Sequence, residues 1–138
     1  MHTALSDESL LVVVADDDPD MLAFVSATLR ADGCSTLEAA DGEELLELLD
    51  QGMDDPRVRP DVLVADVKMP RLSGLGVLQA LKKAGWNLPV VMMTVVSDES
   101  IHTVARRLGA VGVLNKPFDA DDLLTAVRNA RTARDHQH

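Results

Sequence analysis

The chain has 138 residues, a length that fits one compact domain with its own hydrophobic core. Hydrophobic residues make up 46% of the sequence and are spread along it, which excludes a disordered composition. The net charge of −10 argues against direct nucleic acid binding, and no apolar run is long enough for membrane insertion. Cys34 is the only cysteine, so an intramolecular disulfide is excluded and the expected location is a reducing, cytoplasmic compartment.

The first part of the chain predicts a strand followed by a helix. Residues 10–15 form a short apolar run, β-branched in its second half, which is typical of a buried parallel strand. Asp18 and Pro19 then provide an N-cap and a first-turn proline, and Gly33 marks the end of the helix. The helix face that we expect in the core carries Met21, Phe24, Val25, Thr28 and Leu29.

The middle of the chain repeats this alternation. A weaker strand is predicted at residues 35–39, and a second helix opens at Asp41 with acidic residues in its first turn. A polar loop is expected over residues 52–60. Residues 61–65 predict a third strand, and Ser73 starts a third helix.

The last part of the chain adds two more strand–helix pairs. Strands are predicted at residues 89–93 and 111–114, and helices at 98–108 and 119–131. Five strands alternating with five helices predict a doubly wound α/β fold, a parallel sheet with helices on both faces.

The predicted elements divide the chain into a domain and two short flanking segments. Residues 10–131 form the domain, residues 1–9 an N-terminal extension and residues 132–138 a polar C-terminal tail. A protein that stands alone and a piece of a longer one are both compatible with this sequence.

Polar side chains follow the predicted strands at their carboxyl ends, where doubly wound folds carry their chemistry. These residues are Asp16 and Asp17 after the first strand, Asp66 after the third, Thr94 after the fourth and Lys116 after the fifth. Crowded carboxylates repel one another, and oxygen ligands favour a hard divalent cation such as magnesium. A carboxylate beside such a metal can attack phosphorus, while the metal and a lysine neutralise the phosphoryl oxygens.

The motifs at these strand ends stand in a fixed order: Asp16-Asp17, Asp66-Val67-Lys68-Met69-Pro70 with Gly74, Thr94, and Lys116-Pro117-Phe118. Together they resemble the response regulator receiver family of two-component signalling, over about residues 10–131. The resemblance implies a flavodoxin-like, three-layer α/β/α fold with a five-stranded sheet in the order 2-1-3-4-5.

The resemblance also implies a binding site for Mg²⁺ or Mn²⁺. Asp17 and Asp66 would be direct ligands, Asp16 would bind the metal mainly through water, and the backbone carbonyl of Lys68 would supply another ligand.

The implied function is phosphoryl acceptance on Asp66 from a histidine kinase or a histidine phosphotransfer protein, followed by a conformational change that a downstream protein target reads. Thr94 would hydrogen-bond the phosphoryl group, Lys116 would pair with it, and the Lys116–Pro117 peptide bond would be cis. Such a domain promotes its own phosphorylation and dephosphorylation without being a dedicated enzyme. We expect a monomer or weak dimer.

Three positions depart from the family pattern. Val95 follows Thr94 where the family usually has Ala, Gly or Ser, and Val113 replaces an aromatic residue that swings inward on activation. Lys68 places a side chain at the rim of the site, where a solvated lysine and a rate-tuning residue are equally good interpretations. We therefore expect the readout to pass through residues 95–99 rather than through strand 111–114. His102 is expected to be an ordinary surface residue.

Two other interpretations remain open from the sequence. One is a pseudo-receiver that acts as a scaffold without phosphate; Val95 and Val113 favour it, and the complete acidic pocket opposes it. The other is a metal-dependent phosphatase or related hydrolase with an aspartate nucleophile on a similar fold. Such enzymes typically need a second aspartate two residues after the nucleophile, where this chain has Lys68.

Overall fold

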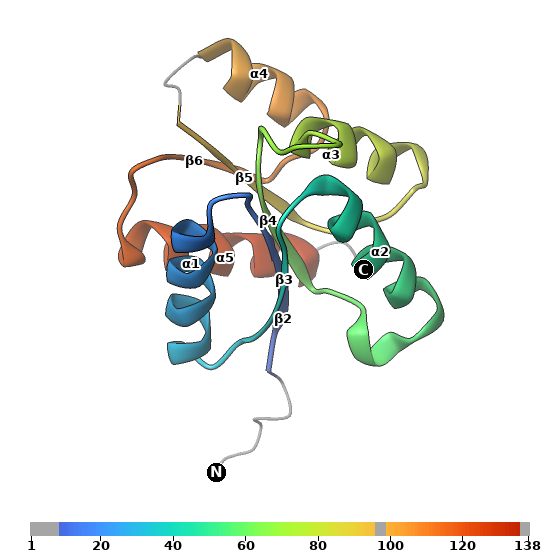
Figure 1. Cartoon of the computed structure of the whole chain (residues 1–138), viewed down its shortest axis with the longest axis horizontal. Helices are drawn as coiled ribbons and strands as arrows, with labels where there is room; N and C mark the ends of the chain where they lie inside the picture. Colours follow the sequence, from blue (N-terminus) through green and yellow to red (C-terminus); the bar gives the residue numbers. More distant parts are fainter. Residues whose placement is uncertain (1–8, 96–98, 136–138) are drawn as a thin grey trace.

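The computed structural model describes residues 9–95 and 99–135 (Figure 1). Its strands are β2 (Leu11–Ala15), β3 (Ser35–Ala39), β4 (Val62–Asp66), β5 (Val90–Thr94) and β6 (Gly112–Asn115). Its helices are α1 (Pro19–Ala31), α2 (Gly42–Asp54), the short 3₁₀ helix η1 (Pro56–Val58), α3 (Gly74–Lys83), α4 (Glu99–Arg107) and α5 (Ala120–Asp135). Within the described residues, no helix is both long enough and apolar enough to cross a membrane.

The five strands form one parallel sheet in the order β3-β2-β4-β5-β6. Counted along the chain this is the order 2-1-3-4-5, so the predicted doubly wound fold is confirmed. The order reverses between β2 and β4, which are neighbours in the sheet although β3 lies between them in sequence. In folds of this type, ligands bind beyond the carboxyl ends of the strands at such a switch point, which here are the ends of β2 and β4.

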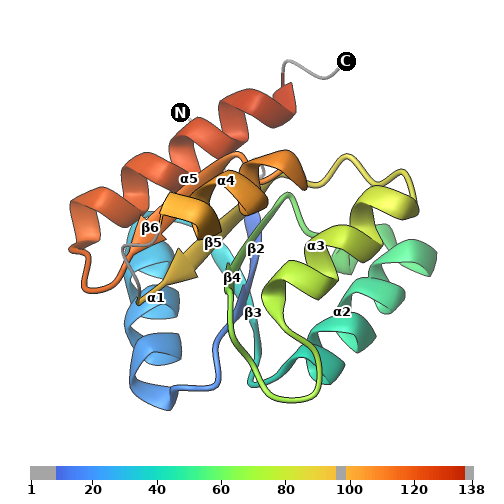
Figure 2. The ribbon, with the colours of Figure 1, turned by 90° about the horizontal axis from the view of Figure 1, so that it is seen from above.

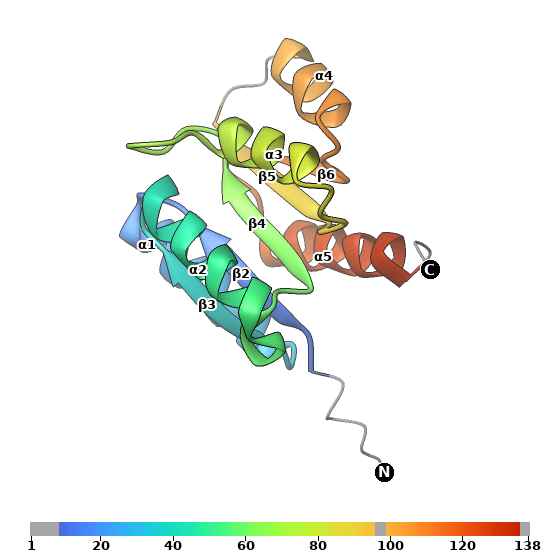
Figure 3. The ribbon, with the colours of Figure 1, turned by 90° about the vertical axis from the view of Figure 1, so that its right-hand side faces the viewer.

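Helices cover both faces of the sheet. Figure 2 shows α1 and α5 on one side and α2 and α3 on the other, and in Figure 3 α2, α3 and α4 follow one another across the sheet. Because side chains alternate along each strand, the two faces build two separate aliphatic cores. Val13 and Ala15 of β2 belong to the core under α2, α3 and α4, whereas Val12 and Val14 belong to the core under α1 and α5.

The helix starts follow the caps that the sequence predicted. The Asp18 carboxylate accepts a hydrogen bond from the Asp20 N–H (3.0 Å) at the start of α1. At the start of α3 the Ser73 hydroxyl oxygen accepts one from the Gly76 N–H (3.0 Å). Each cap pairs a backbone donor that the helix itself leaves unpaired, which fixes where the chain turns after its strand.

Two predicted boundaries differ from those of the structure. Residues 52–60 are not simply a loop, because α2 continues to Asp54 and η1 follows it. The Arg59 guanidinium donates to the carbonyl oxygens of Gly52 (2.8 Å) and Met53 (3.2 Å), so a side chain beyond the helix pairs its last carbonyls. At the other end of the chain, α5 runs to Asp135 rather than to about residue 131, and Arg134 in its last turn pairs with Asp61 (2.7 Å).

The predicted core face of α1 is only partly confirmed. Val25 and Leu29 are fully buried, but the Phe24 side chain is 38% exposed. Its ring instead lies beside that of Phe118, with 6.3 Å between the ring centroids. Phe24 therefore packs against the chain just before α5 rather than entering the core.

Candidate functional site

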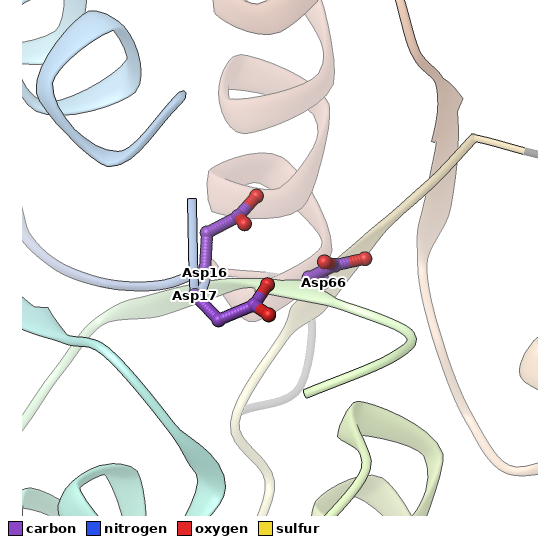
Figure 4. Close-up of side chains that lie close together, drawn as sticks. All are labelled: Asp16, Asp17 and Asp66. Atoms are coloured by element: carbon purple, nitrogen blue, oxygen red, sulfur yellow. The ribbon is translucent and has the colours of Figure 1, made fainter. Parts of the chain in front are cut away.

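Three aspartates meet at the switch point of the sheet (Figure 4). Asp16 and Asp17 directly follow β2, and Asp66 is the last residue of β4, the strand beside it. Parallel pairing brings both strand ends to one edge, so one carboxylate oxygen from each residue lies within 4.8 Å of the other two. The sequence prediction that these three residues lie together is thus met by the geometry.

Lys116 reaches into this cluster from the end of β6. Its ammonium lies 2.6 Å from Asp16 Oδ2 and 3.4 Å from Asp66 Oδ2. Asp16 is almost completely buried, at 1% exposure, and its other carboxylate oxygen accepts a hydrogen bond from the Asp18 N–H (2.9 Å). Asp16 therefore holds the lysine on one side and the N-cap of α1 on the other.

Burial and neighbouring charges shift the pKa values of Asp66 and Lys116. Burial raises the pKa of Asp66, an effect that the Lys116 ammonium opposes and the Asp16 carboxylate reinforces. Burial alone would lower the pKa of Lys116, but the hydrogen bond from its ammonium to Asp16 and the charge of Asp66 outweigh burial and raise it. Lys116 therefore stays charged at neutral pH, and a further cation near Asp66 would favour the ionised carboxylate.

The donor set suits a hard divalent cation. Three carboxylates face a single ammonium, which leaves an excess of negative charge and several free lone pairs in a small volume. Asp17 is exposed, whereas Asp16 is buried and already bonded to Lys116, so a metal entering from solvent meets Asp17 first. The Lys68 N–H lies 3.4 Å from Asp66 Oδ1, which keeps the start of the following loop beside the cluster.

Thr94 and Lys116 are joined through the backbone at the ends of the adjacent strands β5 and β6. Thr94 is 4% exposed and pairs in register with Asn115. The Lys116 N–H donates a hydrogen bond to the Thr94 carbonyl oxygen (2.6 Å). The Lys116–Pro117 peptide bond is cis, as expected. Val95 is 65% exposed, so most of its side chain is open to solvent.

Gly74, part of the predicted motif, has a role that only the structure reveals. A Cβ atom at this position would collide with the backbone carbonyl oxygen of Asp66 and would lie 2.7 Å from the Met92 side chain. The Gly74 N–H also donates to the Val67 carbonyl oxygen (2.9 Å). The first turn of α3 thus packs directly on the backbone of Asp66 and fixes that residue from behind.

His102 lies on the surface of α4, as expected, but it makes a contact that the sequence did not predict. It is half-buried, and its Nε2 atom lies 2.9 Å from Asn115 Oδ1, which joins α4 to the residue just before Lys116. Nothing in the spacing of these two residues signals the contact, because they belong to different elements that meet only in the fold.

The comparisons with known proteins agree with this geometry. The family model for the response regulator receiver domain matches residues 12–128. The response regulator MprA of Mycobacterium leprae is 36% identical over 117 residues, which cover 85% of this chain and 49% of that protein. The transcriptional regulatory protein CpxR of Escherichia coli is 32% identical over 117 residues, covering 85% of this chain and 47% of its own length. The chain thus spans about half the length of these curated relatives.

Solved receiver structures are also similar. A response regulator receiver domain protein from Clostridium thermocellum superposes with a TM-score of 0.84 at 29% identity, over 94% of this chain and 99% of that one. The chemotaxis response regulator CheY4 of Vibrio cholerae gives a TM-score of 0.77 at 28% identity, over 88% of this chain and 98% of that one. With the family model matching most of its length, this chain belongs to the response regulator receiver domain family of two-component signalling.

Proposed function

We propose that this receiver domain accepts a phosphoryl group on Asp66 from a phosphohistidine of a sensor kinase or phosphotransfer protein. The observation that carries the proposal is the position of Asp66. Its carboxylate lies at the switch point, 3.4 Å from the Lys116 ammonium and within 4.8 Å of two further carboxylates. Conformational signalling to a downstream protein follows from the transfer.

In the proposed transfer an Asp66 oxygen attacks phosphorus while the phosphorus–nitrogen bond of the phosphohistidine breaks. The electron pair of that bond leaves with the imidazole, which takes up a proton, and Asp66 becomes an acyl phosphate. Lys116 pairs with a phosphoryl oxygen, and Asp16 orients the lysine through their 2.6 Å contact. Thr94 donates its hydroxyl hydrogen to another phosphoryl oxygen when the domain switches.

The metal ligands belong to the same proposal. Asp17, Asp66 and the Lys68 carbonyl would hold Mg²⁺ or Mn²⁺ directly, and Asp16 would act mainly through water. The metal, when bound, neutralises charge that develops on the phosphoryl oxygens. Asp17 is exposed, whereas Asp16 is already paired with Lys116. We therefore propose that Asp17 contributes more to metal affinity than Asp16 does.

The proposal also covers the rate of phosphorylation, the oligomeric state and the bounds of the domain. The domain promotes its own phosphorylation and dephosphorylation, with Lys68 and Val95 exposed near the site as residues that tune water access. We propose a monomer or weak dimer, with residues 10–131 acting as one unit. Residues 1–8 and 136–138, in the proposed extension and tail, lie outside the described part of the chain.

The test is incubation with a small-molecule phosphodonor and magnesium, followed by mass measurement of the intact protein. The wild type should gain the mass of one phosphoryl group, and Asp66→Asn should gain none. Asp61→Asn is a matched control, because Asp61 precedes the same strand at its other end and pairs with Arg134. Chelation of the metal should suppress the gain in wild type.

Two outcomes would count against the proposal. Equal phosphate uptake by Asp66→Asn would remove Asp66 as the acceptor. A folded, magnesium-loaded wild type that gains no mass would favour the pseudo-receiver scaffold instead.

A further inference from the structure

The loop between β4 and α3, residues 67–73, can be followed in Figure 3. It begins directly after Asp66, at the proposed metal site, and contains a strained turn. The Leu72 N–H donates to the Pro70 carbonyl oxygen (2.8 Å), which closes a turn of three residues. Its central residue, Arg71, has φ +75°, a value that non-glycine residues rarely adopt. A three-residue turn with such a central φ has the features of the rare, strained γ-turn.

Strain of this kind persists only where neighbouring groups hold it in place. Here the neighbours come from the first turn of α2. The Gly42 N–H donates to the same Pro70 carbonyl oxygen (3.3 Å), and Arg71 Nε lies 3.4 Å from Asp41 Oδ2. The turn is thus bound to α2 by one backbone hydrogen bond and one ion pair.

Asp41 is itself fixed by a cap. Its Oδ1 accepts a hydrogen bond from the Glu44 N–H (2.8 Å), and Glu44 Oε1 accepts one from the Ala40 N–H (2.9 Å). This pattern is similar to a capping box, except that Glu44 pairs with the N–H of Ala40, the residue before the N-cap, rather than with that of Asp41. One carboxylate oxygen of Asp41 therefore anchors α2, while the other faces Arg71.

Gly42 is required by the closeness of the two segments. A Cβ atom at this position would collide with the carbonyl oxygen of Leu72 and lie 2.6 Å from its Cβ. Both neighbours belong to a residue of the strained turn, so a side chain at position 42 would push the turn away from α2.

We propose that Asp41 and Gly42 are positioning residues of the metal site: they hold the turn Pro70–Leu72 and thereby fix the loop whose Lys68 carbonyl completes the ligand set. The inference rests on the proposed metal role of Lys68. Mg²⁺ demands nearly ideal octahedral geometry, so a displaced carbonyl weakens its binding directly. The loop is already fixed at its other end, where Gly74 packs on Asp66.

The test is the dissociation constant for Mg²⁺, measured by titration calorimetry on wild type and variants. Gly42→Ala should weaken binding about tenfold, a size typical of outer residues that orient metal ligands. Asp41→Asn keeps a good N-cap but loses the charge on the ion pair, and should weaken binding about threefold at an unchanged melting temperature without metal.

Arg71→Gln separates positioning from simple electrostatics. Removal of a positive charge near the site would, by charge alone, strengthen Mg²⁺ binding. Positioning predicts weaker binding instead. The double variant Asp41→Asn/Arg71→Gln should bind Mg²⁺ about as tightly as the weaker of the two single variants, because both substitutions break the same interaction.

Asp55→Asn is the matched control, since Asp55 caps η1 and pairs with Arg57 (3.0 Å) beyond the far end of α2. It should leave the dissociation constant unchanged. Wild-type or stronger Mg²⁺ binding in Arg71→Gln would overturn the inference alone, whatever the result for Asp41→Asn, because charge alone would then explain both variants. If wild type itself bound no Mg²⁺, the metal part of the proposed function would fail, and the inference with it.

Discussion

Without a metal, the charge of the buried carboxylates at the site is balanced by Lys116. It contacts two buried carboxylates, and its ammonium is the only cationic group that the described residues place against them. Removal of one partner of a buried ion pair is costly because the other charge stays buried without compensation.

We expect Lys116→Met to lower the free energy of unfolding of the metal-free protein by about 3 kcal/mol at neutral pH. Urea denaturation with a chelator present measures this loss. Lys82→Met is the control, because Lys82 is exposed and its ammonium donates to a backbone carbonyl, that of Arg107 (3.0 Å), rather than to a buried carboxylate. Added Mg²⁺ should restore part of the lost stability by supplying the missing positive charge.

The loss of unfolding free energy caused by Lys116→Met should become smaller as the pH falls. The pKa of Asp66 is already raised above its ordinary value of 3.8 in the folded protein, chiefly by burial, and without Lys116 it rises further. A carboxyl group with a raised folded pKa binds protons more tightly in the folded state, so stability increases as pH falls through that folded pKa. An equal loss at neutral and mildly acidic pH would contradict this account.

The residues of the site differ in how far the sequence revealed them. The sequence predicted that three aspartates lie together, because each stands at the end of a strand and parallel pairing brings these ends to one edge of the sheet. They are Asp16, Asp17 and Asp66. Arg71 was not singled out, because the sequence contains no signal that an arginine will adopt a positive φ. Its conformation comes from α2, an element about thirty residues earlier in the chain.

At the scale of elements, α4 and β6 are joined by the hydrogen bond between His102 and Asn115. Asn115 pairs with Thr94 in the sheet and directly precedes Lys116, so both residues proposed to contact the phosphoryl group adjoin it. Val113 of β6 carries no ring that could swing. The contact therefore offers a short route from the site to α4 that needs no aromatic rotor.

We expect a phosphate mimic with magnesium to shift the backbone amide NMR signals of residues 101–103 and Asn115, with only small changes at residues 111–114. His102→Ala should reduce the shifts at residues 101–103 at least twofold while leaving the mimic bound. Val104→Ala, on the exposed side of the same helix, is the control. Residues 96–98 of the loop predicted to take part lie outside the described chain. Larger shifts at residues 111–114 than at 101–103 would exclude this route.

Element starts were better predicted than element ends, for a physical reason. N-caps such as Asp18 and Ser73 act within three residues, so a short window of sequence contains the whole signal. The end of α2 depends on Arg59, which reaches back to carbonyls six and seven residues earlier. The last turn of α5 depends on Asp61 across the fold, and such long-range partners are not visible in local sequence.

For the whole molecule, metal binding and folding should be linked. A ligand that binds only the folded state at a hundredfold its dissociation constant adds about 2.7 kcal/mol of stability. We expect Mg²⁺ to stabilise the wild type by this amount in urea denaturation. Asp17→Ala should lose most of the gain and be more stable than wild type without metal, because carboxylate repulsion is relieved.

The control for this linkage is a potassium salt at matched ionic strength, because the net charge of −10 means that any cation screens repulsion across the surface. Only the difference between the stabilisation by the magnesium salt and that by the potassium salt measures binding at the site. A difference of the same size in Asp17→Ala would show that Mg²⁺ acts elsewhere.

The division of the interior by the sheet has a consequence for how this domain tolerates change. Leu45 lies in the core under α2, α3 and α4, Leu123 in the core under α1 and α5, and both are fully buried. Each substitution to alanine should cost about 2–5 kcal/mol, and their effects should add to within about 0.5 kcal/mol, because the two leucines belong to separate cores on opposite faces of the sheet. A lineage carrying this fold could then remodel one layer of helices, substitution by substitution, while the opposite layer kept its packing unaltered.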